Sequence, residues 1–198
     1  MDIVNNFVRQ FGGSWIKVKL YSDLPKDMVP TNTDYIRFCD AIERARQVPV
    51  LVDKTKIICL GGRYVFGGDP EVDYKALEVC HYKKNIPKEI LKVTFDSIPK
   101  LRNINFIGLN TGGVPDMLIS YAQPVHAMRI LNILGNHKDV VISHLGIAGL
   151  CGNVIAKSYV GRKISFFFGC DAMRSEGYLS NSRLVIGVPS EFFKLTSK

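Results

Sequence analysis

Hydrophobic and polar positions change their period several times along the chain. Residues 15–21 read Trp-Ile-Lys-Val-Lys-Leu-Tyr, and this period of two predicts a half-buried strand. From Asp34 to about Arg46 the apolar side chains, Cys39 among them, recur at helical spacing, which predicts an amphipathic helix with Cys39 turned inward. Later runs predict strands at 48–52, 105–109, 116–121, 139–144, 163–169 and 183–188, and helices at 71–81, 88–94, 124–134 and 190–195, with another ending near 158. Because strands and helices are interleaved, we expect an α/β or α+β fold with a mixed sheet.

Three local features of this pattern lead to sharper predictions. The turn signal Asn-Thr-Gly-Gly at 110–113, between the strands at 105–109 and 116–121, predicts an antiparallel hairpin. Glycine pairs at 61–62 and 67–68 enclose a short run, which indicates an extended segment between tight turns or a close approach of the backbone to another group. In the helix at 124–134 the stripe that we expect to be buried consists of Val125, Met128, Ile130, Leu131 and Leu134.

Two pairs of cysteines have similar spacing at opposite ends of the chain. The first pair is Cys39 and Cys59, and the second is Cys151 and Cys170. An arginine follows the second cysteine of each pair at the same offset: Arg63 in the first case and Arg174 in the second. This repetition favours two related, pseudo-symmetric halves, at about 15–82 and 104–198, within a single domain that spans residues 1–198.

Composition narrows the class of protein without naming a function. Apolar residues make up 46% of the chain and charged residues 22%, which is ordinary for a globular domain. The net charge of +8 and the pI near 9.3 would suit an anionic partner. The basic residues are scattered, however, and nucleic-acid binding therefore ranks third among the functions considered. The longest uncharged stretch, 140–156, is short for a membrane span, and the N-terminus lacks a secretory signal, so we expect no membrane association and a cytoplasmic protein.

Four segments of the chain resemble one known family. They are Arg-Phe-Cys-Asp-Ala-Ile at 37–42, Ile-Cys-Leu-Gly-Gly at 58–62, Gly-Cys-Asp-Ala-Met-Arg at 169–174 and Leu-Val-Ile-Gly-Val-Pro at 184–189. With them, most of the chain from residue 15 onward resembles the uncharacterised ArCR family of archaea and bacteria, also called domain of unknown function 169. Members commonly have proline after the second cysteine, where this chain has Leu60, and often a small residue between the later cysteine and the arginine, here Ala172. The resemblance implies no established activity.

The cysteines support the sharpest functional hypothesis. In a reducing compartment they are free thiols, metal ligands or reactive groups rather than disulfides. If the halves pack face to face, Cys39, Cys59, Cys151 and Cys170 form one site, suited to an iron–sulfur cluster (4Fe-4S) or, as the alternative, a zinc ion. The chain contains no Cys-x-x-Cys, which argues against ordinary ferredoxins and zinc ribbons. Such a protein would act in redox chemistry or metallocofactor handling, with a redox partner. The competing interpretation is that the cysteines are buried core residues.

The runner-up function is the binding of a small anionic molecule. Here Gly61 and Gly62 would let the ligand approach, Arg63 and Arg174 would bind it, and the cysteines would be structural. In a thiolate centre the same two arginines would lower the pKa of the thiols. A reactive-thiol enzyme ranks lower because no histidine stands at a fixed neighbouring place to act as the base for one of these four cysteines. Whether the protein is an enzyme, and whether it forms a homo-oligomer, stays open at this point.

Overall fold

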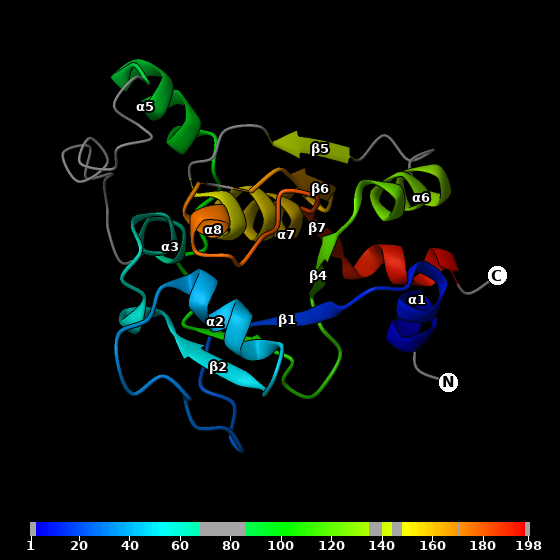
Figure 1. Ribbon diagram of the computed structural model, residues 1–198. Coiled ribbons are helices and arrows are strands. Elements are labelled where there is room, and N and C mark those ends of the chain that lie inside the picture. Colours follow the sequence, from blue (N-terminus) through cyan, green and yellow to red (C-terminus); the bar gives the residue numbers. More distant parts are fainter. Residues whose placement is uncertain (1–2, 68–85, 135–139, 144–147, 170, 197–198) are drawn as a thin grey trace.

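A computed structural model describes residues 3–67, 86–134, 140–143, 148–169 and 171–196. Its centre is a seven-stranded mixed sheet with the order β2-β3-β1-β4-β7-β6-β5 (Figure 1). The strands are β1 (Trp15–Tyr21), β2 (Val50–Asp53), β3 (Phe106–Leu109), β4 (Met117–Ala122), β5 (Val140–Ser143), β6 (Ile164–Phe167) and β7 (Leu184–Pro189). Neighbouring strands are antiparallel except β5 and β6, which are parallel. The predicted mixed sheet with interleaved helices is therefore confirmed.

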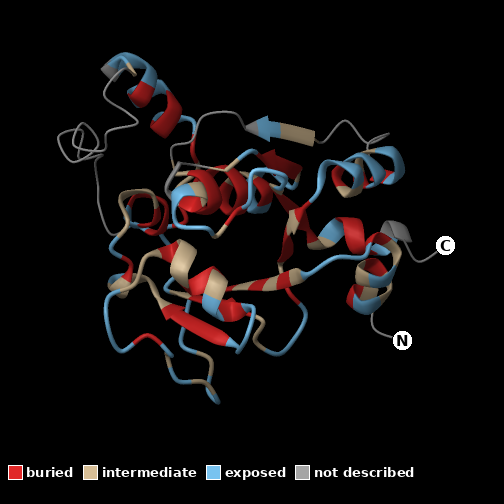
Figure 2. Cartoon of the chain, in the orientation of Figure 1, coloured by how far each residue is buried: buried red, intermediate tan, exposed pale blue. Residues whose placement is uncertain are grey.

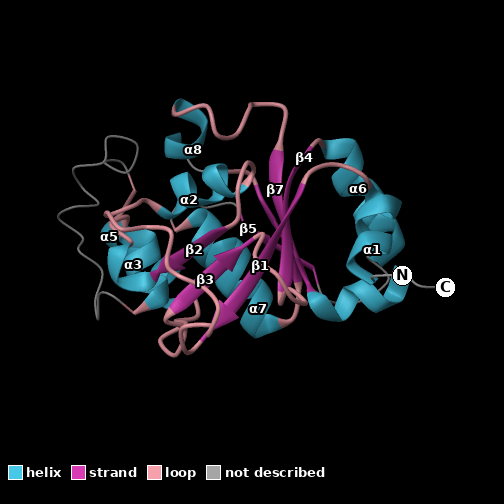
Figure 3. Ribbon diagram, turned by 90° about the horizontal axis from the view of Figure 1, so that it is seen from below, coloured by secondary structure: helices cyan, strands magenta, loops and turns pink. Residues whose placement is uncertain are grey.

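Helices cover both faces of this sheet. In chain order they are α1 (Ile3–Phe11), α2 (Phe38–Ala45), the 3-10 turn η1 (Lys54–Lys56), α3 (Leu60–Phe66), α5 (Lys88–Asp96), α6 (Pro124–Leu134), the π-helix η3 (Gly149–Ala156), α7 (Lys157–Gly161), α8 (Asp171–Ser175) and the 3-10 helix η4 (Ser190–Thr196). Figure 3 shows α1 and α6 on one side of the strands and α2 and α3 on the other. No helix among the described residues has the length and hydropathy that crossing a membrane requires.

Alternate residues of the strands supply two separate cores. In β1, Ile16, Val18 and Leu20 belong to the core under α2, α3 and η3, as the period of two predicted. In β4 the same alternation sends Met117 and Ile119 to that core and Leu118 to the core under α1 and α6. Figure 2 shows the buried residues concentrated in the strands and in the sheet-facing sides of the helices. The protein thus has one sheet with a hydrophobic core on each face.

The predicted hairpin of β3 and β4 is wrong because β1 lies between these two strands. Val18 of β1 is opposite Leu109 of β3 on one side and opposite Met117 of β4 on the other. The connecting segment crosses β1 near its middle, at Val18, and completes its hydrogen bonding: the N–H of Lys17 donates to Asn110 Oδ1 at 2.9 Å, and the N–H of Leu20 donates to Asp116 Oδ2 at 2.8 Å. The turn signal begins where β3 ends, but the side chain of its first residue, Asn110, serves a third strand.

Two other local predictions are also corrected. The run after Cys59 is the helix α3 rather than an extended segment, and Gly67 ends it with a left-handed φ of 84°. In α6 the residues that are buried are Ala127, Ile130 and Leu134, whereas Val125 and Met128 are exposed. α6 therefore buries a narrower stripe than its apolar content predicted.

The strands of the two proposed repeat halves are not separated in the sheet. β3 comes from the segment 104–198, yet it lies between β1 and β2, which come from the segment 15–82. The helix predicted at 71–81 lies outside the described residues. The relation between the halves stays a prediction, and any face-to-face packing of separate halves would have to accommodate this inserted strand.

Candidate functional site

Two adjacent glycines of α3, Gly61 and Gly62, lie in close contact with other parts of the chain. A Cβ atom placed on Gly61 would lie 2.7 Å from the Cα of Ala148 and 3.2 Å from the Sγ of Cys151. One placed on Gly62 would lie 2.9 Å from the Sγ of Cys59. These spaces are filled by protein atoms, so Gly61 allows α3 to approach the start of η3, and Gly62 allows α3 to pack against Ile57 and the Cys59 thiol. The sequence predicted that the backbone at this glycine pair approaches another group closely. In the structure that group is another part of the same chain.

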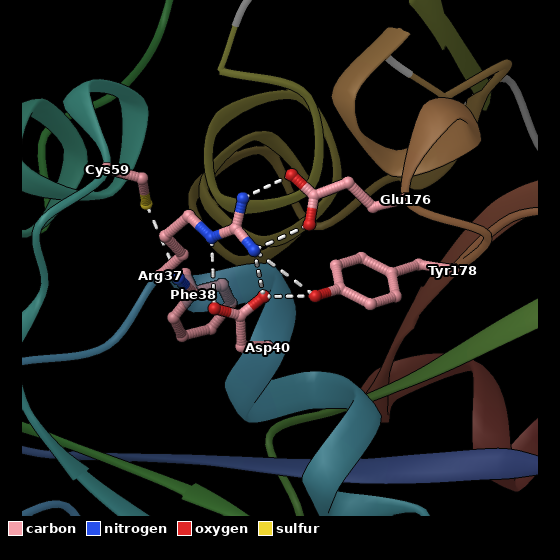
Figure 4. A network of polar contacts seen from close by, with 6 residues as sticks. All are labelled: Arg37, Phe38, Asp40, Cys59, Glu176 and Tyr178. Carbon is pink, nitrogen blue, oxygen red and sulfur yellow. Dashed lines mark hydrogen bonds and ion pairs between the residues drawn. The ribbon is translucent and has the colours of Figure 1, made fainter.

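Cys59 joins the beginnings of two helices. It is the residue that precedes α3, and its Sγ accepts a hydrogen bond from the N–H of Phe38, the first residue of α2, at 3.4 Å (Figure 4). The 3-10 turn η1 and the parallel bridge between Ile36 and Ile57 bring the two segments together just before this point. The thiol therefore lies where α2 and α3 begin, beside Cys39 on the first turn of α2.

Cys151 approaches the same place from the second part of the chain. It is buried in η3, and this π-helix follows Ala148, whose φ of 46° is in the left-handed region. Strained backbone and π-helical turns concentrate at functional sites in proteins. The partly buried Cys39 and Cys59 pack against the core to which Cys151 belongs. Three of the four predicted ligands thus share one core.

The described cysteines are free thiols that share an environment without forming a complete metal site. Cys39, Cys59 and Cys151 form no disulfide. Within the described residues no three His, Cys, Asp or Glu side chains are close enough together to hold a metal ion. Cys170, the fourth predicted ligand, lies outside the described residues. The same is true of Cys80, which was not in the predicted set.

The electrostatics of this site favour neutral thiols. Burial raises the pKa of Cys59, the N–H groups of Phe38 and Gly62 oppose this rise, and the Asp40 carboxylate adds to it. Burial also raises the pKa of Cys151 well above its ordinary value, and the neighbouring Cys59 and Cys39 raise it further. Neither Arg63 nor Arg174 is among the described groups that shift these two pKa values, so their effect on the thiols of a metal centre stays a prediction. The raised pKa values favour the protonated form of Cys59 and Cys151 at neutral pH.

An ion-pair network next to Cys59 connects α2 to the segment after α8. Figure 4 shows the Arg37 guanidinium between two carboxylates: its Nε donates to Asp40 at 3.0 Å, and its Nη2 donates to Glu176 at 2.6 Å. The Tyr178 hydroxyl donates to Asp40 at 2.6 Å, and this bond raises the pKa of Tyr178 to about 12. We call Arg37, Asp40, Glu176 and Tyr178 the clasp. The clasp holds the segment that follows α8 against the start of α2.

Sequence reasoning missed the clasp, although one signal was available. Arg37 and Asp40 have the i,i+3 spacing at which helical ion pairs form. The partner carboxylate, Glu176, is more than a hundred residues away, and nothing in the spacing of charges identifies it. Only the tertiary structure places the two carboxylates on the same guanidinium.

The two predicted arginines have different surroundings. The Nη1 of Arg174 donates to the carbonyl of Ser180 at 2.9 Å, and its Nη2 donates to the carbonyls of Phe168 and Arg183. Arg174 therefore organises the loop between β6 and β7. Arg63 lines an open hollow of about 380 Å³ together with Lys54 and Tyr35. Of the pair, it is Arg63 that faces a space of ligand size.

A mixed seven-stranded sheet with a thiol-containing helix contact on one face defines an α/β protein with a candidate metal or ligand site. The sequence pattern of the uncharacterised ArCR family, domain of unknown function 169, matches residues 16–197, and the chain belongs to this family. An uncharacterized protein of Methanocaldococcus jannaschii is similar to it, with 26% identity over 175 residues that cover 80% of this chain and 73% of the relative. No solved structure matches the chain. The resemblance seen in the four sequence segments is thereby confirmed.

Proposed function

We propose that the protein holds an iron–sulfur cluster, or alternatively a zinc ion, through Cys39, Cys59, Cys151 and Cys170. The observation that carries the proposal is the shared core of three of these thiols, which come from α2, the start of α3 and η3. Two of these elements are far from the third in sequence. Packing needs small apolar residues at these places, but it does not need sulfur at all of them.

The chemistry of the donors agrees with such a centre. Thiolates are the ligands that iron–sulfur clusters and structural zinc prefer. The raised pKa values of Cys59 and Cys151 mean that metal binding must displace their protons. Uptake of metal would therefore release protons and become tighter as the pH rises. The three described sulfurs would have to move closer together, with the fourth ligand supplied from the strand end after β6.

A bound centre would place the protein in redox chemistry or metallocofactor handling. The N–H groups of Phe38 and Gly62, which already act on the Cys59 sulfur, are the kind of donors that tune a cluster. A cytoplasmic location and a redox partner are part of the same proposal, as is the basic surface for docking to an acidic partner.

Anaerobic reconstitution with iron and sulfide, followed by metal quantification and visible absorption, tests the proposal. We expect about one metal centre per chain in the wild type. Cys59→Ser and Cys151→Ser should each weaken binding by at least about tenfold, because a thiolate ligand is lost. Cys80→Ser is the matched control and should bind as the wild type does. Equal metal content in all four proteins, each shown to be folded by circular dichroism, would contradict the proposal.

The second candidate function, binding of a small anion, is favoured by the hollow beside Arg63. Lys54 and Arg63 are among its lining residues, and no acidic side chain is among those described. Inorganic phosphate, titrated by calorimetry, should bind the wild type and the Arg44→Gln control more tightly than Arg63→Gln, since Arg44 is an exposed helical arginine outside the hollow. Indistinguishable titrations of the two variants would remove this candidate.

A further inference from the structure

A second hollow, with no cysteine among its described lining residues, lies at the end of the sheet where β1 begins and β4 ends. Its volume is about 320 Å³, near the lower limit for small-molecule sites. The turn between α1 and β1, the end of β4 and the first turn of α6 form its walls. Side chains from distant segments complete it: Arg46 from the end of α2 and Arg183 from just before β7.

The ionisable side chains that line this hollow include two arginines. Arg46, Arg183 and His126 line it, and none of the described lining residues is acidic. The Arg46 guanidinium is fixed in two ways: its Nη1 donates to Glu43 at 2.9 Å, and its Cζ lies 5.8 Å from the centre of the Tyr121 ring. Arg183 uses its backbone carbonyl to accept from Arg174, while its exposed side chain has no recorded partner within the described part of the chain. A held guanidinium and an uncommitted one therefore face the same space.

Tyr121 contributes to the wall of the hollow, and its buried hydroxyl interacts with the Glu43 carboxylate, which lies outside the lining. Burial and this carboxylate both raise the pKa of Tyr121. Gln123 adds an exposed amide on the rim, which is suited to orient a bound molecule.

We propose that this hollow binds a small organic anion, with its carboxylate or phosphate group held between Arg46 and Arg183. Guanidinium groups present paired N–H donors that match either oxyanion. His126 and Gln123 would contact the rest of the anion. The site uses none of the four predicted metal ligands, so it stands or falls independently of the proposed metal centre.

The fluorescence of the only tryptophan of the chain can report binding at this site. Trp15 lines the hollow, and its indole N–H is fixed on the carbonyl of Gly12 at 2.7 Å. Titration of the full chain with benzoate, phenyl phosphate and inorganic phosphate should change the Trp15 fluorescence to saturation for at least one probe. Benzyl alcohol, a neutral analogue, should not do so. The comparison of benzoate with the two phosphates shows which oxyanion the site prefers.

Charge removal at one position provides the decisive comparison. Arg183→Gln should weaken binding of the best probe about tenfold, as expected for loss of a charge-assisted hydrogen bond. Arg129→Gln, which removes an exposed arginine of α6 outside the hollow, should bind as the wild type does. The proposal is overturned if no probe saturates, if benzyl alcohol gives the same response, or if the two variants weaken binding equally. The described cysteines do not line this hollow, so failure of the proposed metal centre would leave the expected anion binding unchanged.

Discussion

The two faces of the sheet are stabilised in different ways. The core under α1 and α6 is built from large side chains. Phe7 is fully buried, and the centre of its ring lies 4.6 Å from that of Phe11 and 5.3 Å from that of Phe193. The core under α2, α3 and η3 contains the described thiols, a helix contact made by glycine, and the left-handed Ala148. The first face gains stability by filling space with apolar area. The second combines that filling with features that cost stability.

This contrast indicates which of the two cores contains features typical of a functional site. Glycine inside a helix and a left-handed alanine each destabilise the folded chain by about 1 kcal/mol or more. Such features persist where the surrounding structure holds them in place, and they cluster at sites that bind or react. The core under α1 and α6, by comparison, is formed by apolar side chains, and the hollow proposed to bind an anion lies at the edge of that core. The contrast leads to four predictions.

Removing a ring from the core under α1 and α6 should have the largest effect on stability. Phe7→Ala deletes a fully buried ring that contacts three other aromatic side chains, so the free energy of unfolding should fall by about 3–5 kcal/mol in a urea titration. Phe168→Ala is the control, because Phe168 is 53% exposed and should change stability little. Loss of metal binding by folded Phe7→Ala would show that the two faces are not functionally separate.

Adding one methyl group at the helix contact should have a smaller but specific effect. Gly61→Ala places a Cβ against the backbone of Ala148, which cannot move without shifting η3, and should lower the free energy of unfolding by about 1–3 kcal/mol. Gly112→Ala adds the same methyl group where no atom lies within 4 Å, and should be close to neutral. Equal stability of the two variants would contradict the packing role of Gly61.

Thiol labelling tests whether the cysteines on the second face are held as neutral groups. In the metal-free protein, Cys151 and Cys59 should react with iodoacetamide more slowly than they do after unfolding in urea, because burial raises their pKa values and limits access. The rate should increase as the pH rises above the ordinary range of a cysteine. Peptide mapping by mass spectrometry assigns each rate. Rapid labelling of Cys151 at neutral pH would refute its placement in the core.

The clasp should contribute the smallest effect, and its dependence on pH has a defined sign. The hydrogen bond from Arg37 lowers the pKa of Glu176, so folding favours the carboxylate form. The contribution to stability is present above the ordinary glutamate pKa of the unfolded chain and is lost as the pH falls through the lower, folded pKa. Glu176→Gln should therefore lower the Tm slightly at neutral pH and leave it unchanged in strong acid. A difference in Tm that is the same at every pH would exclude this ion pair as the cause.

Periodic features were predictable from the sequence, and features that depend on tertiary contact were not. The alternation at 15–21 determined β1, and the class of fold followed from the interleaved patterns. The helix α1 could have been predicted, since Val4, Phe7 and Phe11 have helical spacing. Insertion of β1 between β3 and β4 could not, because a turn sequence carries no record of a third strand beside it.

The candidate site also combines features that were predictable from the sequence with features that were not. The paired spacing of the cysteines drew attention to residues of which three share a core. The means of bringing them together was missed: Gly61 was assigned to a ligand, whereas it faces Ala148 and Cys151. Neither the π-helix nor the conformation of Ala148 has a residue preference strong enough to be read from one sequence. The carbonyl contacts of Arg174 could not be predicted either, because an arginine that binds backbone carbonyls and one that binds an anion have the same appearance in a sequence.

The position of β3 has a consequence for synthesis of the chain. When a ribosome has made the first hundred residues, β1 and β2 exist but have none of their strand neighbours, since β1 pairs with β3 and β4 and β2 pairs with β3. Both strands then expose unpaired backbone, which is the state most prone to aggregation. The nascent chain must wait for residues 106–109 before its sheet can form, so a pause in translation before that point would leave the protein most dependent on chaperones.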